Sequence, residues 1–365
     1  MKKEFMKRAI RLAQKGRGQV HPNPMVGAVL VKDDLVIAEG YHALFGGPHA
    51  EIAALSQVSP VKSRKSTMYI NLEPCVHHGK TPPCTEAIIK AGIKKVVIGT
   101  EDPNPKVSGR GILALKKAGV EVEVGILGNE CRRLNEAFFK FIQQKQPFVT
   151  IKIAQSLDGK IATENGLSRW ITCEISRKKV HRMRAEHDAV MVGVNTVLRD
   201  DPELSVRHIK GKGGIRIVLD TTLKVPLSSK ILKNQDVQKT IIATSSKADP
   251  EKIHAVRKTG ADVWILPEAA NSGIRLKSLW SRMIKEGMIS VLVEGGCRVF
   301  TSVLASGITD RLVIFTAPKI FGSGLDAIGD LNVKKPSEAL QFNSVKWKAS
   351  GTDIMFDGRL ECLQD

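Results

Sequence analysis

The sequence predicts two α/β domains that meet near residue 146. Strand-like and helix-like stretches alternate along both halves of the chain, a pattern typical of sheets covered by helices. The chain has 365 residues, enough for two hydrophobic cores. A polar segment ending in proline, residues 143–147, interrupts a helical pattern and marks the boundary. We therefore expect a three-layer α/β/α domain over residues 1–145 and a second α/β domain over residues 146–365.

The first half begins with a helix over residues 2–15, because Phe5, Met6, Ile10 and Ala13 form one apolar stripe. Two β-rich stretches, separated by three polar residues, predict an antiparallel hairpin over 25–31 and 35–41. Helices and strands then alternate. We expect helices over 51–55, 84–91, 111–118 and 130–141, and strands over 67–71, 95–99 and 120–124.

The second half is expected to start with a strand over 148–154 and a turn over 156–160. A basic helix over 177–184 and a strand over 189–194 follow, and then a polar segment over 195–207. Further strands are expected over 215–220, 240–244 and 289–294, with a helix over 298–304. Ligands of open α/β sheets bind beyond the carboxyl ends of strands, so the polar segment is a candidate binding loop.

The strand that ends at Glu294 runs through Gly295 and Gly296 directly into a helix. This arrangement lets backbone N–H groups approach a phosphate, although two glycines can also form a simple tight turn. The sequence has no G-x-G-x-x-G, so the usual dinucleotide fingerprint is absent.

The composition limits the classes of partner. The net charge of +19 is spread over both halves, and aromatic residues make up only 5%. Single-stranded nucleic acid is bound by basic residues interleaved with aromatic ones, so we expect small phosphorylated ligands and no nucleic acid. No apolar run reaches the length of a membrane span, and the six cysteines lack the spacing of a disulfide framework. We expect a cytoplasmic protein without a membrane partner.

Four residues between 48 and 84 predict a catalytic zinc site. His49 is followed by Glu51, and Cys75 and Cys84 each follow a proline. One imidazole and two thiolates leave a fourth position for water, as in catalytic zinc sites. His-x-Glu followed by Pro-Cys-x-x-Cys is the signature of zinc nucleobase deaminases, in which the glutamate is the general acid/base. We therefore expect His49, Cys75 and Cys84 to bind Zn²⁺ and Glu51 to move protons in hydrolytic removal of an amine.

Two features distinguish this motif from a chance cluster or a metal clip that only holds a loop. Proline stiffens the backbone next to each sulfur, and Cys84 opens a predicted helix, whose N-terminus favours the thiolate. The spacing departs from the short signature, because eight residues separate the cysteines. We expect this longer loop to contact substrate. His77 and His78 are not expected to be ligands, since three protein groups are sufficient.

These motifs fall in the same order as in a known family. Residues 21–24 (HPNP), 48–51 (PHAE), 73–84 (EPCVHHGKTPPC) and 102–105 (DPNP) resemble the deaminase half of the RibD family of bifunctional riboflavin biosynthesis proteins. The resemblance implies a cytidine-deaminase-like zinc domain that binds one Zn²⁺ per chain. It also implies deamination of a pyrimidine carrying a phosphoribosylamino group, then reduction of the ribose to a ribityl chain by NADPH. We expect a homo-oligomer.

The resemblance also assigns residues to the deaminase pocket. Those expected to line the pyrimidine and ribose phosphate site are Asn23, His42, Lys80, Thr81 and Asn104. Lys80 suits a phosphate or ring-carbonyl contact on chemical grounds alone, whereas His42 could equally be a surface histidine.

The second half resembles the reductase half of the same family, which has a dihydrofolate-reductase-like fold. Residues expected to hold the substrate are Ser168, Arg184, Leu204, Arg207 and Glu294. Residues expected to hold NADPH are Ala154, Trp170, Thr196, Asp200, Thr221, Gly295 and Gly296. Arg184 and Arg207 are expected near the substrate phosphate, because guanidinium groups bind phosphate through two parallel hydrogen bonds.

Two other functions remain open from the sequence. A tRNA or nucleotide deaminase with an accessory domain would share the zinc motif but would not oxidise NADPH. A zinc-stabilised binding module would require four protein ligands, whereas the sequence offers three good ones.

Overall fold

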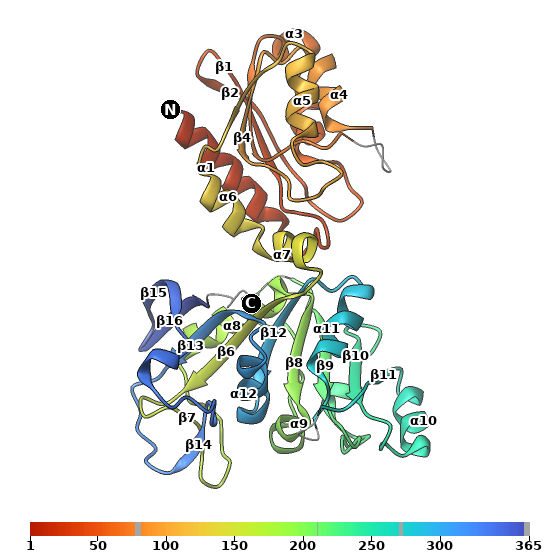
Figure 1. Cartoon of the computed structure of the whole chain (residues 1–365), viewed down its shortest axis with the longest axis vertical. Coiled ribbons are helices and arrows are strands. Elements are labelled where there is room, and N and C mark those ends of the chain that lie inside the picture. Colours follow the sequence, from red (N-terminus) through yellow and green to blue (C-terminus); the bar gives the residue numbers. More distant parts are fainter. Residues whose placement is uncertain (77–81, 210, 270–272, 361–365) are drawn as a thin grey trace. The chain divides into compact units, whose positions relative to one another are not determined.

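The computed structural model describes residues 1–76, 82–209, 211–269 and 273–360. The chain forms two compact units, Met1–Lys145 and Gln146–Asp365. Each unit has its own main sheet (Figure 1). No helix in the described part of the chain is long and apolar enough to cross a bilayer.

The first unit is built on a sheet in the order β2-β1-β3-β4-β5. The predicted hairpin is confirmed, since β1 (Gly27–Lys32) and β2 (Leu35–Tyr41) pair antiparallel. On its other side β1 pairs antiparallel with β3 (Thr67–Leu72). The next strands, β4 (Lys95–Thr100) and β5 (Glu121–Val124), run parallel to β3.

Helices cover both faces of this sheet, which confirms the three-layer prediction (Figure 1). One face packs against α1 (Lys2–Ala13) and α6 (Gly128–Leu134), and the other against α2 (Ala50–Leu55), α4 (Cys84–Lys90) and α5 (Arg110–Lys117). Strand β1 shows why: Val29 and Val31 enter the core under α1, whereas Leu30 enters the opposite core. Short helical turns lie at η1 (Gln14–Gly16) and α3 (Pro60–Ser63).

The single helix predicted over 130–141 is wrong, because two helices meet at Asn135: α6 and α7 (Glu136–Gln144). The backbone of Asn135 leaves the helical region, at φ −109° and ψ 25°. Its buried side chain accepts from the amide of Met25 at 2.8 Å and donates to the Met25 carbonyl at 2.9 Å. The break therefore satisfies two buried backbone groups that lie far away in the sequence.

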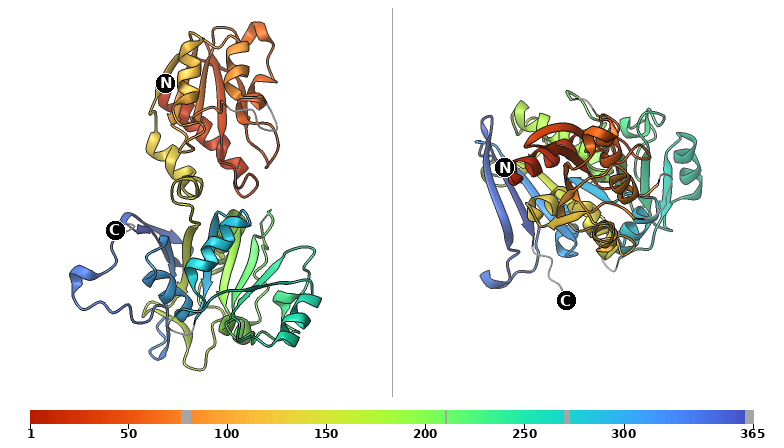
Figure 2. Two further views of the ribbon diagram at one scale, coloured as in Figure 1. Left: turned by 45° about the vertical axis from the view of Figure 1, so that its right-hand side comes forward. Right: turned by 90° about the horizontal axis from the view of Figure 1, so that it is seen from above.

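The second unit contains a longer sheet in the order β11-β10-β9-β8-β12-β6-β13-β16-β15. Its parallel part comprises β6 (Phe148–Gln155), β8 (Ala189–Gly193), β9 (Ile215–Leu219), β10 (Thr240–Thr244), β11 (Asp262–Ile265), β12 (Ser290–Gly295) and β13 (Thr309–Thr316). Two antiparallel strands, β16 (Asp353–Leu360) and β15 (Phe342–Ser350), extend it. They form its outer edge, dark blue in Figure 2. A separate antiparallel pair is formed by β7 (Lys160–Thr163) and β14 (Gly324–Asp326).

Both faces of the parallel strands are buried. Val190 and Val192 of β8 share a core with residues of α8 (Glu174–Glu186) and α10 (Pro250–Lys258). Ala189 and Met191 point into the other core, which includes residues of α11 (Leu276–Lys285) and α12 (Cys297–Ala305). Strands buried on both faces read as continuous apolar runs, which is why the sequence reveals them. Short turns η2 (Lys230–Leu232) and η3 (Pro336–Glu338) complete the unit.

The predicted strand 189–194 ends one residue early, and part of the predicted polar segment is helical. Gly193 caps helix α9 (Val194–Asp200). Only Val197 of this helix is buried, so its sequence lacks the repeated apolar spacing that would indicate a helix.

The strand order places a binding crevice at the carboxyl ends of the parallel strands. The chain moves outward from β8 to β11, and β12 then returns to lie between β8 and β6. At the carboxyl ends of β8 and β12, the chain therefore leaves in opposite directions, toward β9 on one side and toward β13 on the other. Open α/β sheets bind ligands at such a reversal of strand order.

Candidate active sites

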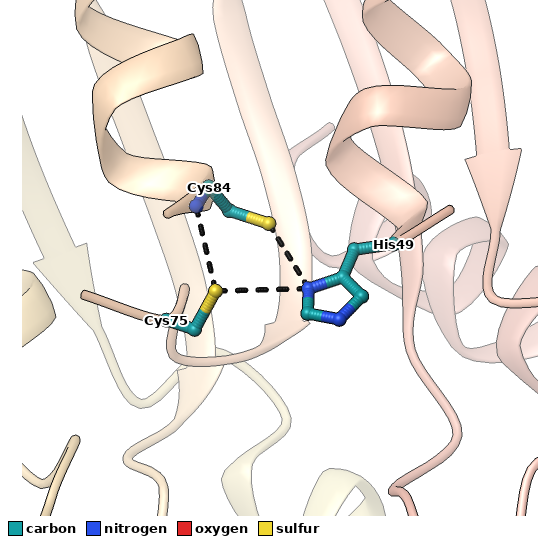
Figure 3. Close-up of side chains that lie close together, drawn as sticks. All are labelled: His49, Cys75 and Cys84. Atoms are coloured by element: carbon teal, nitrogen blue, oxygen red, sulfur yellow. Dashed lines mark hydrogen bonds between the residues drawn. The ribbon is translucent and has the colours of Figure 1, made fainter. Parts of the chain in front are cut away.

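In the first unit, His49, Cys75 and Cys84 converge (Figure 3). The imidazole Nδ1 of His49 lies 3.2 Å from the sulfur of Cys84 and 3.6 Å from the sulfur of Cys75. All three candidate ligand atoms lie within 4.8 Å of one another. This is the only such cluster of metal-binding side chains among the residues that the structure describes.

Three structural elements bring these side chains together. His49 is the N-cap of α2, Cys75 follows β3, and Cys84 is the first residue of α4. The predicted position of Cys84 at a helix N-terminus is thus confirmed, but the lowered pKa expected there is not, because the hydrogen bond with Cys75 and burial raise the pKa of the Cys84 thiol. The backbone amide of Cys84 donates to the sulfur of Cys75 at 3.4 Å. Hydrogen bonds from the Cys84 and His49 side chains lower the pKa of the Cys75 thiol, which favours the metal-binding thiolate.

The donor set fits a zinc ion. Zn–S bonds of about 2.3 Å and Zn–N bonds of about 2.0 Å in a tetrahedral site place nitrogen and sulfur ligands about 3.5 Å apart. The two measured distances lie close to this value. Imidazole and thiolate groups are also ligands that zinc prefers.

Glu51 lies beside the cluster without belonging to it. It occupies the first turn of α2, two residues after His49, and is only 3% exposed. Burial raises the pKa of Glu51 to about 7. Its carboxyl group interacts with the side chain of Cys84. A carboxyl group so placed can exchange protons with a molecule bound at the cluster.

One predicted pocket residue, His42, lies next to His49, and a second, Asn23, contacts His42. The rings of His42 and His49 meet edge to face, with centroids 5.5 Å apart. His42 is buried, and its Nδ1 lies 3.0 Å from the carbonyl oxygen of Pro48. Its Nε2 lies 3.3 Å from Nδ2, the side-chain amide nitrogen of Asn23. His42 is therefore not a surface histidine, and Asn23, His42 and His49 form a connected row.

A buried carboxylate organises the loop that contains Asn104. Glu73 accepts hydrogen bonds from the amides of Asp102, Gly109, Gly111 and Ile112. The amide of Asn104 in turn donates to Asp102 at 2.8 Å. Within the described part of the chain, Asn104 makes no contact with His49, Cys75 or Cys84. Lys80 and Thr81, and likewise His77 and His78, lie outside the described residues.

The second unit contains a cleft of about 1680 Å³ at the carboxyl ends of the parallel strands. Predicted substrate residues that line it are Ser168, Arg184, Arg207 and Glu294. Predicted cofactor residues that line it are Ala154, Trp170, Thr196, Asp200, Thr221, Gly295 and Gly296. Leu204 is not among the lining residues, because its side chain is 4% exposed and packs in the core beneath α8.

Glu294 pairs with two cations in this cleft. Arg184 donates from Nε to one carboxylate oxygen at 2.5 Å and from Nη2 to the other at 2.9 Å. The ammonium group of Lys152 lies 3.3 Å from the second oxygen. Burial alone would raise the pKa of Glu294, but the charges of Arg184 and Lys152 outweigh it and lower the pKa to about 2. Glu294 is therefore ionised, and two fixed cations surround it.

The Gly295-Gly296 turn has the geometry expected from the sequence. Gly295 ends β12, and Gly296, at φ +82°, caps α12. A Cβ atom on Gly295 would lie only 2.8 Å from Oγ1 of Thr196 and 2.9 Å from Val192. Position 295 therefore leaves no room for a side chain, and both glycines line the cleft. This cradle fits the phosphates of a dinucleotide.

Further contacts involve the predicted residues Ser168, Asp200 and Trp170. The hydroxyl of Ser168 donates to the carboxylate of Asp200 at 2.9 Å. The guanidinium of Arg177 lies 4.6 Å from the ring centroid of Trp170, and it also donates to the carbonyl of Thr172 at 2.7 Å. The exposed indole of Trp170 is thus held by a cation–π contact at the rim of the cleft.

Sequence reasoning missed Lys152, Arg177 and His181, which also line the cleft. Lys152 carried a usable signal, because it is the only charged residue of the predicted strand 148–154. Arg177 and His181 lie on a helix with many basic residues, and nothing in their local sequence distinguishes them.

The fold and the first site define a class of enzyme. A three-layer α/β/α unit with a His/Cys/Cys cluster and an adjacent buried glutamate is a zinc-dependent deaminase. In this chain it is joined to an α/β unit with a cleft suited to a dinucleotide.

Comparisons with known proteins agree with this class. A family model described as the cytidine and deoxycytidylate deaminase zinc-binding region matches residues 1–100, and one described as the RibD C-terminal domain matches residues 147–356. The riboflavin biosynthesis protein RibD of Aquifex aeolicus is 47% identical over 354 residues, 97% of each chain. RibD of Escherichia coli is 36% identical and covers 96% of this chain and 97% of its own.

Solved structures extend the likeness to the whole chain. A deaminase/reductase from Thermotoga maritima superposes with a TM-score of 0.86, at 40% identity and 99% coverage of both chains. RibD of Acinetobacter baumannii gives a TM-score of 0.88 at 34% identity, also with 99% coverage of both chains. The chain belongs to the RibD family of riboflavin biosynthesis proteins. It is a bifunctional enzyme with a zinc-dependent deaminase unit and an NADPH-dependent reductase unit, and the two predicted folds are confirmed.

Proposed function

We propose that the two units act in sequence on one phosphorylated pyrimidine. The first would hydrolyse the ring amine of a diaminopyrimidinone carrying a ribosylamino phosphate, and the second would reduce the ribosyl chain of the product to a ribityl chain. The cluster of His49, Cys75 and Cys84 beside Glu51 carries this proposal. The name of the T. maritima relative supports the order, because it describes a diaminohydroxyphosphoribosylaminopyrimidine deaminase and a phosphoribosylaminouracil reductase.

In the deaminase unit, each residue has a proposed role. His49, Cys75 and Cys84 would hold zinc, which supplies a Lewis acid that acidifies a water molecule. Glu51 would take a proton from that water and deliver protons to the leaving ammonia. Its buried position and raised pKa suit a group that both accepts and donates protons near neutral pH.

Five residues are proposed to hold the pyrimidine and its ribose phosphate: Asn23, His42, Lys80, Thr81 and Asn104. The row from Asn23 through His42 to His49 supports the first two. His42 would keep its proton on Nδ1, because the Pro48 carbonyl accepts it there. Its Nε2 then accepts from the Asn23 amide, which fixes the orientation of that amide beside the metal ligands.

In the reductase unit, NADPH is proposed to lie along the cleft and to supply the hydride. Residues proposed to hold it are Ala154, Trp170, Thr196, Asp200, Thr221, Gly295 and Gly296. The substrate would lie against Ser168, Arg184, Arg207 and Glu294, and the buried Leu204 would support the segment from beneath. Arg184 is already paired with Glu294. The half-exposed side chain of Arg207, by contrast, contacts only Glu203 within the described part of the chain. Arg207 is therefore the better candidate for the substrate phosphate.

Replacing Gly295 with alanine is expected to weaken NADPH binding by about tenfold. The new Cβ would displace Val192 or Thr196, and Thr196 lines the cleft beside the turn. Titration of protein fluorescence with NADPH measures this change. Ammonia release by the same variant serves as the internal control and should equal that of the wild type. Unchanged NADPH affinity would show that the cofactor phosphates bind elsewhere.

The proposed function is tested by supplying the diaminopyrimidinone ribosylamino phosphate and following ammonia and NADPH separately. Ammonia should appear first, without NADPH, and NADPH oxidation should require the deaminated product. Ammonia release without any NADPH oxidation would instead favour a nucleotide or tRNA deaminase with an accessory unit.

The family resemblance also leads us to propose a homo-oligomer that works in the cytoplasm. Strand β15 ends the sheet of the second unit, and Val345, Trp347 and Ile354 on its last two strands are 41%, 68% and 54% exposed. Such an apolar edge suits burial against another copy. Free thiols that serve as metal ligands are also typical of a reducing compartment. Sedimentation analysis should give a mass above that of one chain, and a monomer at micromolar concentration would refute the oligomer.

A further inference from the structure

Two side chains of α8 hold the backbone of residues 205–207. The Nη1 group of Arg184 donates to the carbonyl oxygen of Ser205 at 3.0 Å. The amide of Arg207 donates to Nδ1 of His181 at 3.1 Å. His181 and Arg184 are three residues apart on the helix and therefore lie on one face of it. Arg184 thus fixes the segment by donating to a backbone carbonyl, and His181 fixes it by accepting from a backbone amide.

The His181 ring is firmly placed. The residue is 8% exposed and lines the cleft together with Arg184 and Arg207. The ring of His208 packs against it edge to face, with centroids 5.4 Å apart. Burial, with the positive charges of Arg184 and Arg207, lowers the pKa of His181 to about 4. The ring is thus neutral at physiological pH.

The direction of the hydrogen bond follows from the donors present. A backbone amide can only donate, so Nδ1 accepts from Arg207, and the neutral ring carries its proton on Nε2. The carbonyl oxygen of Ser205 is also 3.2 Å from Nδ1 and could accept a second hydrogen bond besides that from Arg184, but a protonated Nδ1 could not accept from the Arg207 amide, which points at it. Without an acceptor at Nδ1, the Arg207 amide would lose its partner.

The side chain of Arg207 is weakly held by comparison. Its side chain is 53% exposed, and its guanidinium meets Glu203 at 3.3 Å. An exposed pair of this kind contributes little to holding an arginine in one orientation. The position of the guanidinium in the cleft therefore depends mainly on where its backbone is fixed.

We propose that His181 is a positioning residue of the reductase, which fixes the main chain at Arg207 and thereby places its guanidinium against the phosphate of the ribosyl substrate. The inference rests on the proposed reductase function, in which Arg207 meets that phosphate. It assigns to His181 a contribution to the recognition of phosphorylated over unphosphorylated substrate. His181 itself touches neither the hydride donor nor the acceptor.

Replacing His181 with leucine tests this role in the full-length enzyme, with the deaminated ribosylamino phosphate and NADPH as substrates. The reductase KM for the phosphorylated substrate should rise by about tenfold, because the fixed position of the guanidinium is lost. The kcat should stay within about twofold. The KM for the same compound without its phosphate should be equal in variant and wild type, and ammonia release should be unchanged.

Two amide variants keep the test decisive even if the leucine variant does not fold. His181→Asn places an oxygen acceptor near the position of Nδ1, whereas His181→Gln places it near Nε2. Only His181→Asn should restore a near wild-type KM. The proposal is overturned by a wild-type KM in His181→Gln or His181→Leu, or by equal loss of affinity for both compounds and for NADPH. A wild-type enzyme that fails to oxidise NADPH with either compound would refute the proposed function instead.

Discussion

Replacing Glu51 with glutamine is expected to lower kcat for ammonia release by about a thousandfold. General acid–base groups contribute roughly 10²–10⁴-fold to catalysis, and here one carboxyl group is proposed both to accept and to donate protons. Glutamine has nearly the same shape, so the buried space beside α2 stays filled. The zinc content should be unchanged, because Glu51 is not part of the His49, Cys75 and Cys84 cluster.

Two controls belong to this measurement. Glu130→Gln changes an exposed glutamate of α6 in the same unit and should leave ammonia release at the wild-type rate. NADPH oxidation with already deaminated substrate should be equal in all three proteins. Full deaminase activity in Glu51→Gln would remove Glu51 from the mechanism, whereas loss of zinc would make it a structural residue.

Replacing Glu294 with glutamine is expected to destabilise the second unit by about 3 kcal/mol or more. The change leaves Arg184 and Lys152 as buried cations without their common anion, and breaking a buried pair on one side has this cost. For a unit of this size the melting temperature should fall by about 10 °C. NADPH oxidation should fall by about a hundredfold, because Arg184 also holds Ser205.

Glu286→Gln is the matched control for this loss. Glu286, the C-cap residue of α11, pairs with Arg282 of that helix at 2.9 Å, and both side chains are about half exposed. Such a surface pair contributes about 1 kcal/mol at most. Calorimetry should therefore show a nearly unchanged melting temperature for this variant. If Glu294→Gln has the melting temperature of the wild type, the ion pairs of Glu294 with Arg184 and Lys152 do not stabilise the second unit.

Much of the fold could be predicted because short apolar stretches in the local sequence indicate the buried strands. The predicted strands 67–71 and 95–99 each contain three consecutive apolar residues, 68–70 and 96–98, and the observed strands β3 and β4 each extend only one residue further. The break at Asn135 could not be predicted, since its partner Met25 lies far away in the sequence. Helix α9 was missed because it buries only Val197.

The two sites differ in how far the sequence reveals them. His49, Cys75 and Cys84 form a motif in which each ligand adjoins a recognisable helix start or proline, so local patterns identify the ligands before the fold is known. In the second unit the partners come from separate strands and helices. The pairing of Arg184 and Lys152 with Glu294, and of His181 with the Arg207 amide, depends on strand order and cannot be read locally.

The central claim is that one zinc ion, held by His49, Cys75 and Cys84, is needed for deamination and for nothing in the reductase. Zinc content and ammonia release should be measured together in the wild type, in Cys84→Ser and in Cys131→Ala, which removes a buried thiol of the same unit outside the cluster. Wild type and Cys131→Ala should bind about one zinc per chain and release ammonia. Cys84→Ser should lose both properties while it still oxidises NADPH with deaminated substrate. Zinc-free Cys84→Ser that releases ammonia at the wild-type rate would contradict the claim.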